Sequence, residues 1–299
     1  MGMKENRRAE GRIIKGVGGY YYVETSDGSV YECKARGLFR KQGIKPAPGD
    51  YVEFSLPTDT IAGNVEVIKE RMNALKRPYI ANVDQLMVVI AKKRPDPDLL
   101  LVDRLLIYAR LMELPVILVQ NKDDLTGEDI LSQYRDAEVK CMSISVKSGT
   151  GLDEIREVLR GKTTCLAGQS AVGKSSLINA MDPSLSLDTG DLAKKADRGT
   201  HTTRHSEFMR IDSLDCWIVD TPGFSILENA EMSMYDLKDL YPEFTEGAKT
   251  CRFDRCVHIN EPDCGVKKML KEGRISQERY ERYKLIYNEL KEREMNRYD

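Results

Sequence analysis

The sequence predicts a multidomain chain with an all-β barrel, a doubly wound α/β domain and a mostly helical segment that carries metal ligands. Residues 11–70 hold short alternating or β-branched runs between glycine turns, which favours a small barrel. From residue 83, apolar runs alternate with helical patterns, which predicts a parallel sheet with helices on both faces. After Ser225 the strand-like runs stop. We place the domains at residues 1–72, 73–227 and 228–299.

The first domain is expected to have the OB fold. Its strand-like runs are residues 12–15, 20–25, 30–34, 51–56 and 65–68. No acidic residue lies between Cys33 and Gly49, where Phe39 is surrounded by basic residues, namely Lys34, Arg36, Arg40, Lys41 and Lys45. Barrels of this type often bind oligonucleotides on such a surface, so we expect RNA contact there. The alternative is an ordinary solvated loop.

The second domain is expected to contain alternating strands and helices. The predicted strands are residues 85–91, 115–120, 141–146, 163–167, 207–211 and 216–220, with a helix over residues 99–113. In a doubly wound sheet the loops after the strands face the ligand, so the motifs below belong to one edge.

A phosphate loop follows the run that ends at Ala167. The loop comprises Gly168, Gln169, Ser170, Ala171, Val172, Gly173, Lys174 and Ser175, and Ser176 continues into the predicted helix. Backbone N–H groups in such a loop surround the phosphates, Lys174 adds a positive charge, and the Ser175 hydroxyl is a ligand for Mg²⁺. The simpler alternative is a glycine turn.

A guanine-binding signature lies at the end of another strand. It consists of Asn121, Lys122, Asp123 and Asp124, and the strand end at Ser145, Val146 and Lys147 is similar to the base-contact loop of GTPases. The Asp124 carboxylate can accept two hydrogen bonds from guanine, whereas adenine leaves it unpaired at a loss of roughly 1–3 kcal/mol. Alternatively, Asp123 or Asp124 caps a helix.

The order of these motifs is inverted relative to ordinary GTPases, because the guanine signature precedes the phosphate loop. Asp220-Thr221-Pro222-Gly223 then follows the loop, and its carboxylate and the Gly223 N–H suit Mg²⁺ and the γ-phosphate. The motifs therefore predict a circularly permuted P-loop GTPase domain. Phe224 stands where a water-orienting glutamine is common, so intrinsic hydrolysis should be slow.

A switch segment is expected around His201, Thr202 and Thr203. Either threonine can supply the switch hydroxyl, with Thr203 assigned to Mg²⁺. His201 can orient or deprotonate water because imidazole titrates near neutral pH, although a solvated loop histidine is the alternative. The catalytic set is therefore His201, Thr202, Thr203, Lys174, Asp220 and Gly223.

The third domain contains a metal-ligand cluster. Cys251, Cys256, His258 and Cys264 supply three thiolates and one imidazole, which close a tetrahedral shell around one structural Zn²⁺. Free thiols or a redox pair are the alternative. The rest of this domain is polar and helical, with a long helix over residues 275–298.

Composition fits these assignments. The chain has 299 residues, 41% of them hydrophobic and 31% charged, with a net charge of −2. A nearly neutral protein does not belong to the class that coats nucleic acid through a large overall positive charge, so any RNA contact must use local basic patches. The apolar runs are too short to cross a bilayer, and the N-terminus lacks the apolar stretch of a secretory signal, so we expect a cytoplasmic protein with no membrane contact.

The chain resembles the ribosome small-subunit-dependent GTPase A family, also called RsgA, YjeQ or YloQ. The resemblance covers nearly all residues from Gly11 onward and depends on the permuted order and the quoted motifs, including Arg77-Pro78 and Asn82-Val83-Asp84. It implies an OB barrel, a permuted GTPase domain and a zinc domain. It also implies late maturation of the 30S subunit, GTP hydrolysis stimulated by that subunit, contact with 16S rRNA, and a catalytic role for His201. We expect a monomer.

Two other functions remain open from the residues alone. The chain can be a nucleotide-regulated RNA-binding scaffold in which hydrolysis is incidental, which Phe224 permits. It can also be an adenine nucleotidase with a chance match to the guanine signature, and competition between GTP and ATP decides this second alternative.

Overall fold

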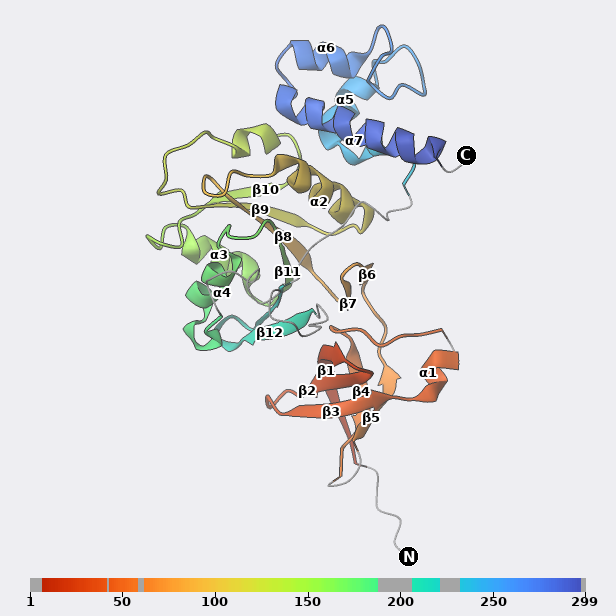
Figure 1. Cartoon of the computed structure of the whole chain (residues 1–299), viewed down its shortest axis with the longest axis vertical. Helices are drawn as coiled ribbons and strands as arrows, with labels where there is room; N and C mark the ends of the chain where they lie inside the picture. The colour runs from red at the N-terminus through yellow and green to blue at the C-terminus, as the bar shows by residue number, and fades with distance from the viewer. Residues whose placement is uncertain (1–6, 42, 59–61, 188–205, 221–231, 297–299) are drawn as a thin grey trace, which may run out of the picture. The chain divides into compact units, whose positions relative to one another are not determined.

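The computed structural model describes residues 7–41, 43–58, 62–187, 206–220 and 232–296 (Figure 1). The predicted site residues His201, Thr202, Thr203 and Gly223 lie outside these ranges. The chain forms two compact units, and neither corresponds to one continuous segment. The first comprises residues 1–85, 155–167 and 193–224, and the second comprises residues 86–154, 168–192 and 225–299.

The first unit contains the expected barrel. The strands are β1 (Arg8–Val17), β2 (Tyr20–Glu24), β3 (Val30–Ala35), β4 (Tyr51–Ser55) and β5 (Gly63–Ile68), closed in the order β1-β2-β3-β5-β4. Only the β3–β5 pair is parallel. Closure leaves no free sheet edge and gives the inward side chains, such as Ile13, Val52 and Phe54, a dry core.

The short helix α1 (Gly37–Lys41) corrects one part of the surface prediction. It directs Phe39 into the barrel core, where only 7% of this residue is exposed. Phe39 therefore cannot offer its ring to an RNA base. Arg36 also forms an ion pair with Glu66 at 2.7 Å, so its charge is partly balanced.

The connection between β5 and the sheet contains a hairpin that we did not predict, β6 (Ala74–Lys76) and β7 (Tyr79–Ala81). Each strand is only three residues long, which is too short to give an alternating pattern. Arg12 of β1 anchors this region. Its guanidinium donates to the carbonyl oxygen of Asn82 at 3.0 Å and to the Thr163 hydroxyl at 2.9 Å.

The six-stranded sheet has the order β10-β9-β8-β11-β13-β12. Its strands are β8 (Gln85–Ala91), β9 (Val116–Asn121), β10 (Lys140–Ser143), β11 (Thr163–Ala167), β12 (Glu207–Ile211) and β13 (Cys216–Asp220). Every residue of β8 and β11 is buried, as expected for strands covered on both faces. One expectation was wrong: β12 runs antiparallel to β13, because the turn Asp212–Leu214 is too short for a crossover.

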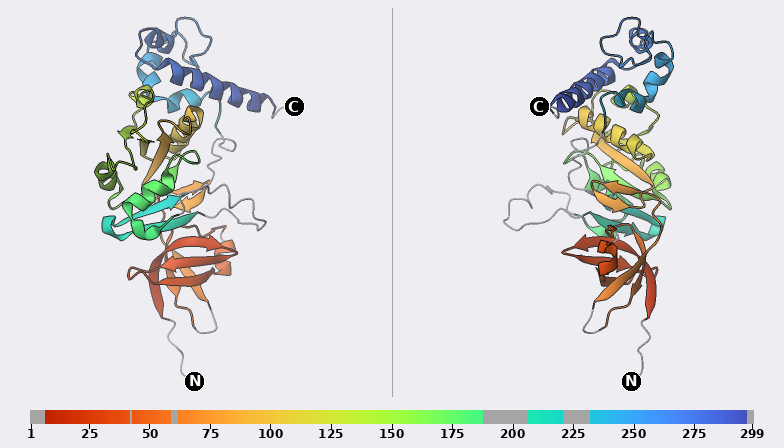
Figure 2. Two further views of the ribbon diagram at one scale, coloured as in Figure 1. Left: turned by 60° about the vertical axis from the view of Figure 1, so that its left-hand side comes forward. Right: turned by 90° about the vertical axis from the view of Figure 1, so that its right-hand side faces the viewer.

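The second unit carries most of the helices. They include α2 (Leu99–Leu111), α4 (Lys174–Met181), α5 (Thr245–Ala248), α6 (Gly265–Lys271) and α7 (Gln277–Met295). The helix α3 (Leu152–Leu159) crosses the boundary between the two units. Single turns of 3₁₀ helix at Leu131–Tyr134, Leu237–Leu240 and Pro242–Phe244 complete the unit, with further turns at Pro183–Leu185 and, in the first unit, Asp212–Leu214. Helices α2 and α7 lie side by side (Figure 2).

The contact between α2 and α7 is ionic at its centre. Asp103 of α2 is fully buried and accepts hydrogen bonds from Arg279 and Arg282 of α7. Arg279 also donates to Glu243, and its guanidinium lies 4.8 Å from the ring centroid of Tyr241. Two carboxylates thus offset two guanidinium groups, which a buried position requires. In the described residues, no helix is long and apolar enough to cross a membrane.

Candidate nucleotide-binding site and metal centre

The phosphate loop has the strand, loop and helix context that the sequence predicts. It leaves the buried strand β11 at Gly168 and enters α4 at Lys174, with Gly173 as the N-cap in the left-handed region at φ 103°. A Cβ atom on Gly168 would lie 2.0 Å from the carbonyl oxygen of Val89, and one on Gly173 would lie 2.3 Å from Nδ2 of Asn121. Both positions therefore require glycine, and the loop packs directly on the end of β8.

The loop lysine is already held over the loop. Lys174 Nζ donates to the carbonyl oxygens of Gly168 and Gln169, both at 2.8 Å. Ser175 and Ser176 are half-buried in the first turn of α4. The Gln169 side chain accepts a hydrogen bond from the backbone N–H of Asp98 at 2.8 Å, and Asp98 caps α2. The phosphate loop is thus tied to the start of α2.

Asn121 joins the two nucleotide motifs. Its Nδ2 donates to the carbonyl oxygen of Val172 in the phosphate loop at 2.9 Å, and its Oδ1 accepts from the N–H of Val146 at 3.2 Å. Asn121 is buried at the end of β9. Segments far apart in sequence therefore meet at one side chain. These bonds hold the two loops together, and contact of Asn121 with the nucleotide stays a prediction.

Lys122 and Asp123 also bind protein groups. Lys122 Nζ donates to the carbonyl oxygen of Ala171 at 2.8 Å and to that of Arg94, and burial lowers its pKa. Asp123 pairs with Lys92 at 2.8 Å, and this hydrogen bond lowers the pKa of the carboxyl. Lys122 therefore lies across the phosphate loop, and Asp123 faces solvent.

Asp124 has the partner that a base-binding carboxylate needs. Its Oδ1 accepts a hydrogen bond from the Ser145 hydroxyl at 2.7 Å, and Ser145 is only 1% exposed. Ser145 also accepts from the N–H of Ser148 at 3.2 Å, which fixes the loop that carries Val146 and Lys147. Among the described contacts, the second carboxylate oxygen of Asp124 has no hydrogen-bond partner, and Lys147 is exposed two positions after Ser145.

The structure describes only part of the predicted catalytic set. Asp220 is half-buried at the last position of β13, in the first unit. His201, Thr202, Thr203 and Gly223 belong to segments outside the described residues, so their roles remain predictions.

The four predicted metal ligands converge in the second unit. Their ligand atoms all lie within 4.8 Å of one another. Cys251 Sγ lies 3.8 Å from Cys264 Sγ, and His258 Nδ1 lies 3.6 Å and 3.4 Å from these two sulfur atoms. Tetrahedral zinc with Zn–S bonds of about 2.3 Å places neighbouring sulfurs about 3.8 Å apart. The cluster therefore fits a metal ion of this size.

Burial favours the uncharged forms of Cys256 and His258. Desolvation raises the pKa of the Cys256 thiol to about 12 and lowers the pKa of His258 to about 4. The imidazole is thus neutral and ready to bind a metal, whereas the thiolates need a positive charge beside them. No acidic side chain among the described residues competes within this set.

Residues outside the ligand set shape the metal loop. Glu261 accepts hydrogen bonds from the N–H groups of Val257 at 2.7 Å and Ile259 at 2.9 Å. Tyr280 and Tyr283 of α7 donate their hydroxyl protons to the carbonyl oxygens of His258 and Val257, both at 2.6 Å. Sequence reasoning missed these supports, although two tyrosines three positions apart on a helix give a face that can be searched for.

Comparisons with known proteins agree with these sites. Residues 68–230 match the model of the RsgA GTPase family, and residues 10–63 match that of the RsgA N-terminal domain. The small ribosomal subunit biogenesis GTPase RsgA of Agathobacter rectalis is 46% identical, covering 95% of this chain and 99% of that protein. The Alkaliphilus metalliredigens protein of the same name is 42% identical, with coverages of 95% and 98%.

Two solved structures share the fold. The crystal structure of YjeQ from Thermotoga maritima has a TM-score of 0.77 at 35% identity and covers 95% of this chain and 99% of that one. The crystal structure of YloQ, described as a circularly permuted GTPase, has a TM-score of 0.74 at 33% identity, with coverages of 98% and 99%.

Proposed function

Because the chain belongs to the RsgA GTPase family, we propose that it binds the small ribosomal subunit and assists its late maturation while hydrolysing GTP. The relatives named small ribosomal subunit biogenesis GTPase support the partner. One observation carries the nucleotide half of the proposal: Asn121 bonds both the phosphate loop and the loop after β10, so the permuted motifs form one site.

In this proposal the two loops divide the nucleotide between them. Backbone N–H groups of residues 168–176 and the N-terminus of α4 surround the phosphates, and Lys174 turns from the loop carbonyls to the β- and γ-phosphates. Asp124, oriented by Ser145, accepts the guanine N1–H and amino protons. Val146 and Lys147 cover the base. GTP is therefore preferred over ATP, because adenine leaves the carboxylate without donors.

Hydrolysis needs groups from three parts of the chain. Ser175 and Asp220 are the proposed magnesium ligands, with Thr203 as the switch ligand, and Mg²⁺ would neutralise charge on the phosphates. The Gly223 N–H meets the γ-phosphate, and Thr202 supports the switch segment. Since Phe224 lacks a polar group, His201 is proposed to orient the attacking water once the ribosomal subunit is bound.

The remaining partners follow from the same proposal. One structural Zn²⁺ is proposed at Cys251, Cys256, His258 and Cys264, since the donor set leaves no open position for chemistry. The protein is proposed to act in the cytoplasm as a monomer. The barrel domain of residues 1–72 and the zinc domain of residues 228–299, which precede and follow the GTPase domain of residues 73–227 in sequence, are proposed to contact 16S rRNA.

GTP turnover with isolated ribosomal subunits tests the function. We expect slow intrinsic turnover, a clear increase with 30S subunits and little response to 50S subunits or to ATP. Equal turnover with and without 30S subunits would contradict the proposal. If a non-hydrolysable GTP analogue supports a full maturation cycle, the scaffold function is favoured instead. Full stimulation of a His201→Ala protein would remove His201 from catalysis.

A further inference from the structure

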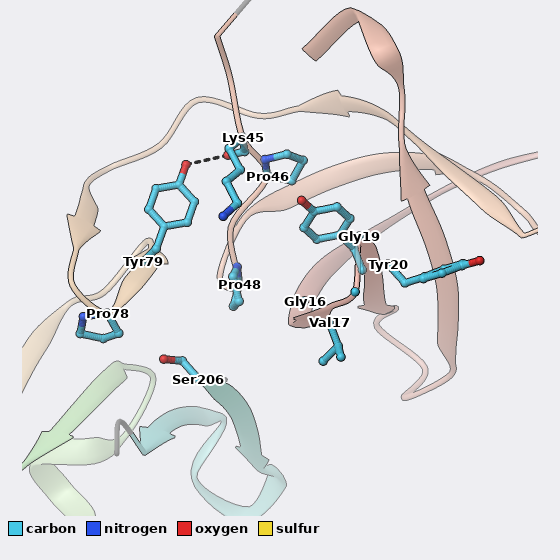
Figure 3. Close-up of a pocket in the computed structure, with 12 residues that line it drawn as sticks. Gly16, Val17, Gly19, Tyr20, Lys45, Pro46, Pro48, Pro78, Tyr79 and Ser206 are labelled. Carbon is cyan, nitrogen blue, oxygen red and sulfur yellow. Dashed lines mark hydrogen bonds between the residues drawn. The ribbon is translucent and has the colours of Figure 1, made fainter. Parts of the chain in front are cut away.

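A cavity of about 350 Å³ lies in the first unit, at the rim of the barrel. The glycine-rich turn between β1 and β2 forms one wall, and the hairpin residues Pro78 and Tyr79 form another, with Lys45 and Ser206 beside them (Figure 3). The volume falls in the range of about 300–1,000 Å³ that small-molecule sites occupy. The nucleotide and zinc residues described above do not line it.

Tyr79 is a fixed aromatic wall of this cavity. Its hydroxyl donates to the carbonyl oxygen of Lys45 at 2.7 Å. Arg71 donates to the same carbonyl at 2.7 Å and is itself held by two hydrogen bonds to the fully buried Asp50, at 2.7 and 2.8 Å. A ring held in this way loses little conformational entropy when a ligand stacks on it.

The charge of the cavity favours an anion. Lys45 Nζ is exposed and lies 5.3 Å from the Tyr79 ring centroid, and it points into the space near Pro48 (Figure 3). Lys34 does not line the cavity, but its Nζ lies 4.9 Å from the ring centroid of the lining residue Tyr20. No acidic residue is among the described residues that line the cavity. Ammonium groups beside aromatic rings match a ligand that combines flat bases with phosphates.

We propose that this cavity holds one unstacked base of single-stranded RNA, with its ring on Tyr79 and its phosphate at Lys45. Pro46, Pro48 and Pro78 supply the apolar floor, and the exposed turn residues Gly18 and Gly19 offer backbone groups that can pair with base edges. A duplex cannot enter, because its bases are stacked on one another and only an extruded or unpaired base has a free face. The inference rests on the proposed function, which supplies RNA as the partner.

Ser206 connects the cavity to the proposed switch segment along the chain. This residue lines the cavity and immediately precedes β12, at the end of the chain segment that contains His201 and Thr203. Lys15 of β1 also pairs with Glu207 at 3.0 Å. An RNA base in the cavity would therefore contact a residue that is three positions after the proposed switch residue Thr203.

A short single-stranded oligoribonucleotide with a central 2-aminopurine tests the cavity in the full-length protein. We expect its fluorescence to be quenched on binding, because the base stacks on Tyr79. Tyr79→Leu should weaken binding about 5- to 150-fold. Tyr79→Phe keeps the ring and should stay within about threefold of the parent protein. Lys45→Gln should reduce the salt dependence by about one phosphate contact.

Tyr22→Leu is the matched control, since Tyr22 lies on β2 outside the cavity and bonds Glu32. Unchanged GDP affinity is the control that each variant is folded. If Tyr79→Leu does not fold, the change in salt dependence of Lys45→Gln becomes the test of the cavity. Equal affinities of the Tyr79 and Tyr22 variants, or no quenching, would overturn the proposal. A Tyr79→Leu variant that binds 30S subunits more weakly but binds the oligoribonucleotide normally would also overturn it, because the ligand of the cavity would then be a protein. If 30S subunits do not stimulate GTP turnover by the parent protein, that result contradicts the proposed function and not the cavity proposal.

Discussion

At the scale of single residues, Asn121 and Asp124 have different tasks within one short motif. Asn121 bonds Val172 and Val146 and so sets the distance between the loops. Asp124 is held by Ser145 and keeps an oxygen for the base. We therefore expect the roles of the two residues to be separable, because Asn121 supports the site and Asp124 is proposed to bind the base.

Substitution at these two positions should give distinct results. Asn121→Ala is expected to weaken the binding of GTP and of xanthosine triphosphate (XTP) equally. Each 1.4 kcal/mol of binding free energy lost through disorder of the two loops corresponds to about a 10-fold weaker affinity. Asp124→Asn is expected to shift preference from GTP to XTP, because the amide donates where the carboxylate accepted. Competition binding with the two nucleotides measures both effects. Asp123→Asn is the control and should leave preference unchanged; an equal shift there would contradict the assignment.

At the scale of elements, α2 is the shared support of the second unit. Its first turn is tied to the phosphate loop through Asp98 and Gln169, and its middle is tied to α7 through Asp103. Ile107 of the same helix packs in the core that contains Cys256 and Cys264. A displacement of α2 would therefore alter both the phosphate loop and the metal-ligand cluster.

Breaking the buried ion network should destabilise the protein strongly. Asp103→Leu leaves Arg279 and Arg282 buried without their shared carboxylate, and we expect a loss of about 3–5 kcal/mol in the free energy of unfolding. Glu157→Gln removes an exposed pair with Arg160 and should change stability by less than about 1 kcal/mol. Denaturant unfolding of both variants measures the difference. Similar losses for the two would show that the Asp103 network is not a main support.

At the scale of the whole molecule, the metal ligands lie in a core formed mostly by residues 232–290, and Ile107 of α2 packs into the same core. Because this core also contains residues of α7, the folding energy that a bound zinc ion would supply would also support elements outside the metal loop. The nucleotide and metal sites are therefore expected to be coupled although their side chains do not touch in the described contacts.

Removing zinc tests this coupling. A zinc-selective chelator in excess Mg²⁺ is expected to lower helical content and to weaken GDP binding about 5-fold or more, since α2 loses part of its support. Circular dichroism and GDP titration provide the two measurements. Adding back Zn²⁺ should restore both. Loss of helix with unchanged GDP affinity would contradict a role for α2 in linking the sites.

Sequence alone was sufficient for everything that depends on residue type and local order. The barrel, the phosphate loop, the guanine signature, the permuted order and the four metal ligands were all found from the sequence, because each is a short pattern with its own chemistry. It placed α2 at residues 99–113 and α7 at residues 275–298, close to the observed Leu99–Leu111 and Gln277–Met295.

Only the tertiary structure decided which side chains meet. It buried Phe39 in the barrel, turned β12 antiparallel, assigned Asn121 to joining two loops, and paired Asp103 with arginines far along the chain. It also brought Lys45 and Tyr79 together at one cavity. These outcomes depend on contacts between distant segments. Local propensity and spacing carry no information about such contacts, because their free energy arises only when the segments have packed.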